Sequence, residues 1–371
     1  MPRRHPWAFS LLALLLLNTA AQAQESPTSV TRARTARPAW QWTVELGREH
    51  DDNVLQLTRA GLDRFAIRPG PPRFRISDVG DWATTGDASL RWTGRVLRRR
   101  DTRLSATGSF QRWDRDRVAD WHQFGVGMTQ ELTSSRRHLL SAQLWLKHIP
   151  RYYLGEVTDL DASVLAGTRV RASLSYAQTA YGIGFTQDLW NGRVSASGTL
   201  EREHRNYNPN FPERDNDNDM VSLGLSVKPL RRNGPTLGVS WIKGDLNAAG
   251  DLPDTLFVRD QDISYDHHGF EGSFSQSWSV GALRGRLDAS YLREDRRYLT
   301  TDIFDVNRYS RTNRRREADL RVTERLFAST DLIVTWSRLS SEATYDVLSL
   351  VEPSTTDFKQ EKFGVSLRTR W

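Results

Sequence analysis

The sequence predicts an all-β fold, namely a transmembrane antiparallel up-and-down β-barrel of about fourteen strands. Runs of about 9 to 11 residues alternate apolar and polar side chains from Trp40 to Trp371, as expected of strands that face lipid on one side and water on the other. Short turns alternate with long charged loops between the runs, and the charged residues within the runs keep to one parity. Two soluble β-sandwiches, the alternative, would need a linker and would lack this regular difference in loop length.

The amino terminus predicts export. A basic start at residues 3–5 precedes an apolar segment, Trp7 to Leu17, and a small-x-small cleavage site, Ala21 to Ala23. The apolar segment is shorter than the roughly 18 residues that a spanning helix needs. The predicted division is a signal peptide at 1–23, a periplasmic tail at 24–38 and an outer-membrane barrel at 39–371.

Composition narrows the class of protein further. The 371 residues include no Cys, which excludes disulfides, Cys-ligated metals and a lipid anchor on Cys. Hydrophobic residues make up 38% of the chain, and 13 Trp with 24 Tyr plus Phe favour the aromatic girdles of a barrel. The formal net charge of +7 favours anionic partners, either lipopolysaccharide at the rim or an anionic solute in a pore. Export makes nucleic acid an unexpected partner.

The alternating runs predict strands in the following order. The apolar faces of the first half are Trp40–Leu46, Ala88–Val96, Leu104–Phe110, Phe124–Met128, Leu140–Leu146, a run within 170–189, and Val194–Leu200. Those of the second half are Val221–Val227, Leu237–Trp241, Phe270–Phe274, Leu287–Tyr291, Ala318–Val322, Leu332–Trp336 and Phe363–Trp371. Tyr176 and Tyr181 have opposite parity, so we expect a bulge or a bend in the run within 170–189.

Turn and loop chemistry separates these strands. The short turns are predicted at 98–101, 133–137, 190–192, 231–234, near 281 and at 328–331, and Trp190-Asn191-Gly192 is the clearest hairpin signal. The long loops are predicted at 51–83, 114–120, 150–168, 205–219, 244–260, 295–312 and 340–358. Pro69, Pro71 and Pro72 are expected to exclude regular structure from the first of them. Short turns would then be periplasmic and long loops extracellular.

The last strand carries an assembly signal by resemblance. Phe363, Val365, Leu367 and Trp371 lie on one face and end the chain on an aromatic residue. This ending resembles the carboxy-terminal signal of bacterial outer-membrane β-barrel proteins, which implies the barrel assembly machinery as a partner.

The water-facing parity predicts the pore lining. A charge on a lipid-facing midplane position costs about 2 to 4 kcal/mol, so charges confined to one parity indicate a lumen. The predicted pore-lining residues are Arg91, Arg95, Arg103, Lys147, Glu201, Arg286, Asp288, Glu317, Asp319, Arg321, Arg368 and Arg370, with Glu45 and Lys362 on the same parity. We expect Arg91, Arg95, Arg103, Arg368 and Arg370 to form one basic wall that favours anions. A lumen of mutually paired charges is the alternative.

The sequence predicts no catalytic, metal or cofactor site, and therefore no enzyme. Tyr265-Asp266-His267-His268 could place an acid beside a base, but a polar junction between loop and strand is the favoured interpretation. Asp215, Asp217 and Asp219 alternate as in a calcium loop, yet the Gly and the distal Glu of an EF-hand are missing.

The end of the first strand carries a second resemblance. The run from Val44 to Val54, with Asp51-Asp52-Asn53 near its end, resembles the opening strand of surface lipoprotein assembly modifiers and related exopolysaccharide-associated outer-membrane proteins. The resemblance implies a barrel that passes or delivers a macromolecule, although no helical repeat precedes Trp40. The sequence therefore predicts an outer-membrane channel or export conduit for anionic solutes or polysaccharide. The alternative is a surface assembly or adhesion factor.

Overall fold

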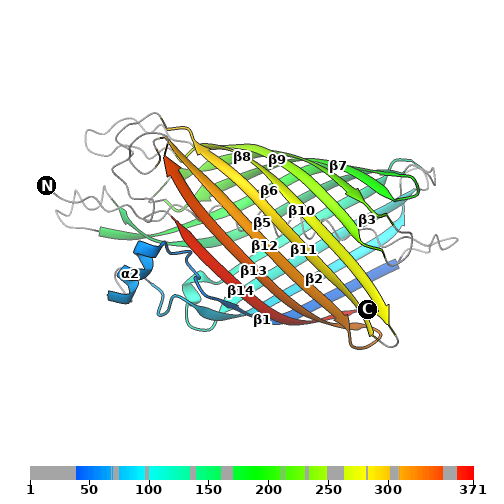
Figure 1. The fold of residues 1–371 in the computed structure, drawn as a ribbon, viewed down its shortest axis with the longest axis horizontal. Helices are drawn as coiled ribbons and strands as arrows, with labels where there is room; N and C mark the ends of the chain where they lie inside the picture. Colours follow the sequence, from blue (N-terminus) through cyan, green and yellow to red (C-terminus); the bar gives the residue numbers. More distant parts are fainter. Residues whose placement is uncertain are drawn as a thin grey trace.

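The protein is a closed antiparallel barrel of fourteen strands, seen in a computed structural model (Figure 1). The structure describes residues 39–67, 69, 75–96, 100–133, 139–159, 170–209, 211, 214–229, 234–248, 263–280, 283–300, 308, 310–345 and 357–371. The predicted signal peptide and tail lie outside these residues, as do Pro71, Pro72 and most of the turns predicted at 98–101, 133–137 and 231–234.

Each strand is hydrogen-bonded to its neighbours in sequence, and β1 closes the barrel by pairing with β14. The strands of the first half are β1 (Ala39–Asp51), β2 (Asp81–Arg95), β3 (Asp101–Trp113), β4 (Trp121–Glu131), β5 (Leu139–Asp159), β6 (Val170–Leu189) and β7 (Val194–Tyr207). Those of the second half are β8 (Asn216–Val227), β9 (Thr236–Ala248), β10 (Tyr265–Val280), β11 (Leu283–Tyr298), β12 (Arg311–Arg325), β13 (Thr330–Tyr345) and β14 (Phe358–Arg370). The predicted fold class is confirmed.

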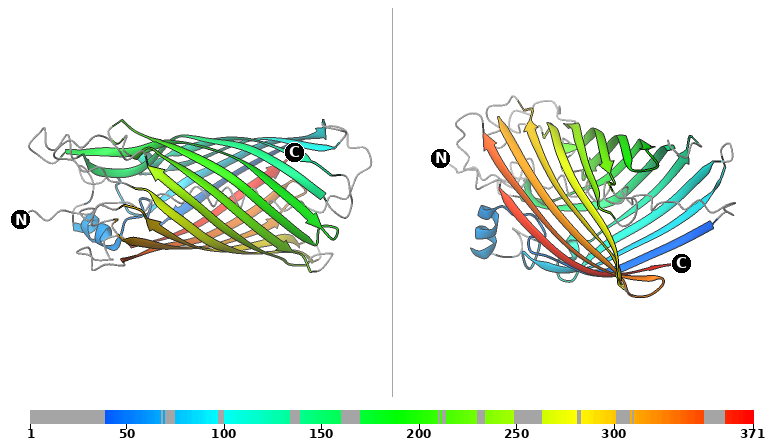
Figure 2. Two further views of the ribbon diagram at one scale, coloured as in Figure 1. Left: turned by 90° about the horizontal axis from the view of Figure 1, so that it is seen from above. Right: turned by 45° about the vertical axis from the view of Figure 1, so that its right-hand side comes forward.

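The two ends of the barrel differ. The segments that join β2 to β3, β4 to β5 and each later pair in that series are short, and we call their side the turn end. The opposite side, the loop end, carries the longer connections. Figure 2 shows the strands crossing the long axis obliquely, with the carboxyl terminus at the turn end. The first barrel residue, Ala39, lies at the same end, because it pairs with Thr93 near the end of β2.

The turn at Trp190-Asn191-Gly192 forms as predicted. Its three residues have φ values of 50°, 61° and 76°, in the left-handed region that Asn and Gly adopt most readily. The amide groups of Gly192 and Arg193 both donate to the carbonyl of Leu189.

The predictions for β5 and β6 need correction. β6 is regular throughout, so Tyr176 points inward and Tyr181 outward without a bulge. The register shifts lie in β5 instead, between Ile149 and Tyr152 and between Tyr153 and Gly155. Because the shifts absorb the break that Pro150 causes, β5 continues to Asp159, and residues 150–159 are strand rather than the predicted loop.

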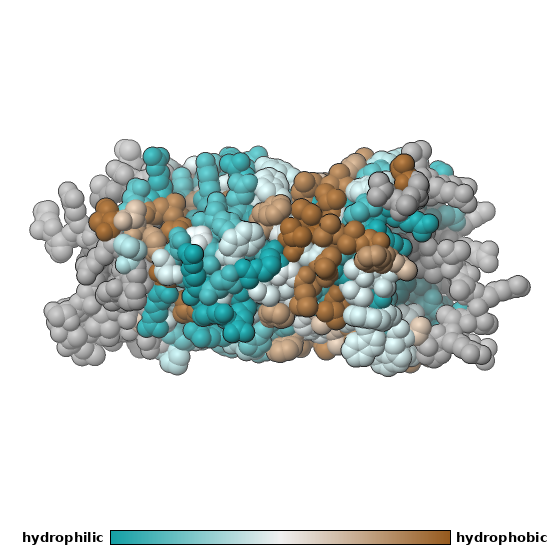
Figure 3. Space-filling view, turned by 90° about the horizontal axis from the view of Figure 1, so that it is seen from below, coloured by the Kyte–Doolittle hydropathy of each residue, from teal (hydrophilic) through white to brown (hydrophobic). Residues whose placement is uncertain are grey.

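The outer wall has an apolar belt and a charged tier. Apolar side chains face outward near the middle and the turn end of every strand, among them Trp42, Leu46, Phe124, Leu144, Leu223, Val239, Phe270 and Phe363. Outward-facing charged side chains occupy the same strands nearer the loop end, among them Arg48, Arg202, Lys243, Arg293, Arg316 and Glu361. Figure 3 shows the belt as a brown band beside a broad hydrophilic surface. An exposed apolar belt of this kind on a closed barrel is a lipid-facing surface.

The connection from β1 to β2 contains a helix that the sequence analysis missed. α2 (Arg59–Ile67) lies beyond the strand ends, at the loop end (Figures 1 and 2). The connection packs against Tyr153 of β5 through four apolar side chains, Leu55, Leu57, Phe65 and Ile76. It therefore reaches past β3 and β4 to contact β5. The described part of the chain contains no helix that is both long and apolar enough to cross a membrane.

Candidate functional site

All the predicted pore-lining residues lie on the inward parity of their strands. The pairing register fixes this, because inward residues pair with inward residues around the barrel and the belt occupies the other parity. The lumen is therefore the candidate site, and its charges differ from tier to tier.

The turn end of the lumen is basic but partly paired. Asp331 of β13 lies 2.9 Å from Arg370 and 3.0 Å from Arg368, and Arg325 lies 3.7 Å from it. Arg95 is 3.3 Å from Asp101 in a similar way. The expected wall of free arginines is thus replaced, on β12 to β14, by three guanidinium groups that share one carboxylate.

The middle of the lumen is acidic on the side formed by β10 to β14, β1 and β2. Glu45 binds Arg321 at 3.0 Å and accepts a hydrogen bond from Ser366. Other carboxylates there have hydroxyl or guanidinium partners. These are Asp288 with Arg286 at 2.7 Å, Asp319 with Ser290 at 3.2 Å and Glu271 with Ser240 at 3.3 Å. Sequence reasoning missed Asp87 and Glu271, although their parity matches that of Arg91 and of Ser273.

The opposite wall, on β3 to β9, has small side chains at the same height. Its inward positions are Ser105, Thr107, Gly125, Gly127, Gly182, Gly184, Ser197, Thr199, Ser222, Gly224, Gly238 and Ser240. Trp145 is the large exception on this stretch, with Lys147 and Glu201 just above it towards the loop end.

Water reaches the inward side chains of the middle and the turn end. Asp87, Arg91, Arg95, Ser197 and Ser277 all point inward and are exposed. An inward side chain that is exposed requires water inside the barrel, so the interior there is not a packed core.

The loop end of the lumen is packed instead. Glu294 lies 2.9 Å from Arg296 and 3.1 Å from His267, and all three side chains are buried. Glu203 and Arg205 form a second fully buried ion pair. The arginines stack on tyrosines: Arg205 on Tyr176, Arg296 on Tyr265 and Arg311 on Tyr298, at 5.4, 5.3 and 4.9 Å from the ring centroids.

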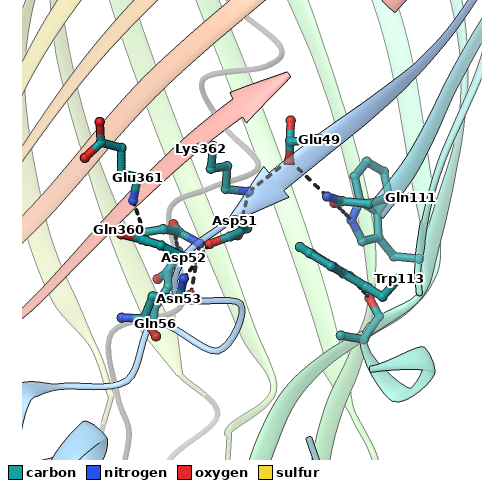
Figure 4. A network of polar contacts seen from close by, with 12 residues as sticks. Glu49, Asp51, Asp52, Asn53, Gln56, Gln111, Trp113, Gln360, Glu361 and Lys362 are labelled. Carbon is teal, nitrogen blue, oxygen red and sulfur yellow. Dashed lines mark hydrogen bonds and ion pairs between the residues drawn. The ribbon is translucent and has the colours of Figure 1, made fainter. Parts of the chain in front are cut away.

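The Asp51-Asp52-Asn53 motif closes the seam between the first and last strands (Figure 4). Asp51 accepts from Gln360 at 2.6 Å and lies 3.2 Å from Lys362. Asn53 donates to the carbonyls of Leu57 and Lys359, and Asp52 accepts from the amide of Glu361. In the loop, burial raises the pKa of Asp52, and burial likewise raises the pKa of Asp116 against hydrogen bonds from Ser77.

The acid–base and metal candidates are dispersed. His267 points inward, whereas Asp266 and His268 point outward, so the Tyr265–His268 run offers no acid beside a base. Asp217 faces outward and binds Arg202 and His204, both at 2.7 Å. In the described ranges there is no group of three or more His, Asp and Glu side chains placed to hold a metal ion.

No protein-family model matches this sequence, and no curated protein matches it. Solved barrels are similar to it at low identity. An anion-selective porin from Comamonas acidovorans has 12% identity over 90% of this chain and 99% of its own, with a TM-score of 0.40. The outer membrane channel DcaP of Acinetobacter baumannii has 9% identity over 90% and 97%, with a TM-score of 0.44. The TodX monoaromatic hydrocarbon channel has 8% identity over 90% of each chain, with a TM-score of 0.45.

These likenesses concern the fold alone. The closed barrel, its lipid-facing belt and its wetted interior are features of this chain itself. Together they make it a transmembrane β-barrel of the kind found in bacterial outer membranes.

Proposed function

We propose that this barrel is a channel for polar solutes. The observation that supports the proposal most directly is the exposure of inward side chains in the middle and at the turn end, together with the wall of Gly, Ser and Thr opposite the acidic side. Small side chains leave the interior space to water and solute.

We further propose that the channel prefers anions, including acidic polysaccharide, and that the turn-end mouth sets this preference. Along β12 to β14 and β1 to β3, six inward arginines outnumber three inward carboxylates near that mouth. The arginines are Arg91, Arg95, Arg103, Arg325, Arg368 and Arg370, and the carboxylates are Asp101, Asp331 and Glu45, the register partner of Arg368. A field of this sign raises the local anion concentration and is screened over about 8 Å at physiological salt.

The test is the zero-current potential of the purified protein in a planar bilayer under a salt gradient. Replacing Arg91 and Arg95 together by Ser should shift the potential by several millivolts towards cation preference, and the shift should shrink at higher salt. Replacing the outward-facing Arg314 and Arg316 by Ser provides the matched control, because it removes the same charge from the outer wall and should leave the potential unchanged.

Three results would each overturn one of these proposals. A cation-selective wild type, or no shift in the Arg91/Arg95 variant, would remove the anion preference but leave the channel. A folded protein without conductance at any salt would remove the channel, and the alternative of a surface assembly or adhesion factor would then be favoured.

Lipopolysaccharide is the outer partner that we propose. Arg293 and Arg316 lie directly opposite each other on the outer wall, one row above the belt residues Tyr291 and Ala318. Two like charges in direct register repel each other. Each guanidinium group has a carboxylate neighbour, Asp295 at 3.6 Å from Arg293 and Glu342 at 3.0 Å from Arg316, and a lipid phosphate group would be a further anion for the pair. The phosphate groups of the outer leaflet lie at this height, just beyond the hydrocarbon.

A further inference from the structure

Trp145 lies over glycine residues on the inner wall of the barrel, whereas Trp278 lies over a glycine on the outer wall. Its register partner on β6 is Gly182, and a Cβ on Gly182 would overlap the indole ring. A Cβ on Gly184 would lie 3.3 Å from Cζ3 of the same ring. The ring therefore lies flat on the inner wall, across β6, with one face on the backbone.

The outer wall contains the same arrangement. Trp278 of β10 lies over Gly285 of β11, and its indole group donates to Glu324 of β12 at 3.2 Å. Inside the barrel, Trp145 of β5 lies over Gly182 of β6, and its indole group lies near enough to the carboxylate of Glu201 on β7 to interact with it. A ring over glycine is thus a way of bracing the sheet. The two tryptophans differ in what their other ring face contacts. The free face of Trp278 lies on the outer surface, and the free face of Trp145 lies in the lumen.

Polar groups surround the lumen face of Trp145. Oε1 of Glu201 is buried and has no hydrogen-bond donor among the described residues. Lys147 lies two residues along β5 from Trp145, on the same face, and interacts electrostatically with Glu201. Thr199 lies two residues from Glu201 on β7 and shares a hydrogen bond of 2.5 Å with Ser222. A flat apolar surface edged by an acceptor, a cation and hydroxyl groups matches one class of molecule.

We propose that Trp145, Glu201 and Lys147 form a saccharide-binding subsite on the inner wall. The C–H face of a pyranose ring carries partial positive charge and stacks on the negative face of an indole ring. Its hydroxyl groups then donate to the carboxylate group of Glu201 and accept from the ammonium group of Lys147. Gly125 and Gly127 on the neighbouring strand β4 leave the space beside the ring to the sugar. This inference rests on the proposed channel and names a class of solute for it.

The experiment measures how an added neutral glucose hexasaccharide interrupts the ion current through single channels. Polyethylene glycol of the same hydrodynamic size is the volume control, because it fills the lumen without stacking. We expect the hexasaccharide to block the wild type at concentrations about tenfold lower than the glycol, and Trp145→Ala to abolish this difference. Trp145→Phe should retain part of it, and Glu201→Gln should shorten each blockade.

Trp278→Ala is the matched structural control. This variant removes an indole ring that also lies over a glycine, but on the outer wall. It should therefore lower the stability of the barrel without changing the blockades. A hexasaccharide that blocks no better than the glycol, or equal blockades in the wild type and Trp145→Ala, would overturn the subsite while leaving the channel intact.

If the folded protein does not conduct, calorimetric titration of the detergent-solubilised protein with the hexasaccharide tests the subsite alone. Binding that Trp145→Ala abolishes and Trp278→Ala preserves supports it even then. No binding by the wild type overturns it.

Discussion

Asn53 joins two backbone segments at the loop end of the seam, its own connection after β1 and strand β14. Its side chain donates to the carbonyls of Leu57 and Lys359 and accepts from the amide group of Leu57, and it is 2% exposed. The amide side chain is the one type at this site that can both donate twice and accept. The motif that resembles a macromolecule-exporting family therefore has a structural explanation in this chain.

Asn53→Ala should destabilise the folded barrel by about 1 to 3 kcal/mol for each buried group left without a partner. The measurement is the temperature at which the folded form converts to the unfolded form on a denaturing gel. Asn247→Ala, at an exposed outward position of β9, is the control and should not change that temperature. Equal temperatures for the two variants would refute the role of Asn53.

Strand β14 both closes the barrel by pairing with β1 and carries the last residues of the chain. Phe363, Val365 and Leu367 face outward, as predicted, and pair with residues of β13 and β1. Trp371 extends this pairing, because its amide group donates to the carbonyl of Trp42 at 3.0 Å and its carbonyl accepts from Trp42 at 3.1 Å. The role of these residues as a signal to the assembly machinery remains a prediction.

Deleting Trp371 should lower the yield of heat-modifiable barrel in the outer membrane without reducing export across the inner membrane. Trp371→Ala separates the two possible reasons, because it retains the backbone hydrogen bonds to Trp42 and removes only the ring. A yield as low as that of the deletion indicates that the ring is read during assembly, whereas a normal yield indicates that the backbone seam matters. An unchanged yield after the deletion itself contradicts both.

The strand faces were predictable because a period of two residues assigns every side chain once a few are placed. What depends on distant partners was not. The continuation of β5 past Pro150 relies on pairing with β6, and α2 is held by packing against Tyr153. A local signal for α2 was present, since Thr58 accepts a hydrogen bond from the amide group of Gly61 as a helix cap does.

The lumen was predictable in parity but not in pairing. Asp331 had been assigned to a turn, so its three arginine partners could not be foreseen. Trp145 gives no separate signal in the sequence, because Leu144 and Leu146 beside it carry the apolar pattern of the strand. In both cases the missing information was which side chains the curvature of the barrel brings together.

At the scale of the whole molecule, adjacent residues on one strand face different solvents. Leu223 of β8 is 53% exposed on the belt, and Ser222 beside it faces the lumen. One face of each strand contacts lipid and the other contacts water. The effect of an introduced charge on stability therefore depends on the parity of its position more than on its place along the chain.

Leu223→Arg should reduce the stability of the assembled barrel by about 2 to 4 kcal/mol, because the charge would lie in hydrocarbon. Ser222→Arg should leave assembly intact, since the same side chain would lie in water, and should reduce the conductance. Unfolding in denaturant after insertion into lipid vesicles measures the first effect, and bilayer recording measures the second. A greater loss of stability in Ser222→Arg would reverse the assignment of the two faces.

The charged tier on the outer wall also separates the part of the barrel that lies in lipid from the loop end. Because the belt lies in the middle and towards the turn end, the strands themselves hold the barrel in lipid, and the charged tier sets the loop-end residues of the strands beyond the hydrocarbon. A foreign peptide inserted directly after Ala248 of β9 or Tyr345 of β13 would then begin at a fixed distance from the lipid. The lipid-facing belt and the loop end can therefore be engineered independently of each other.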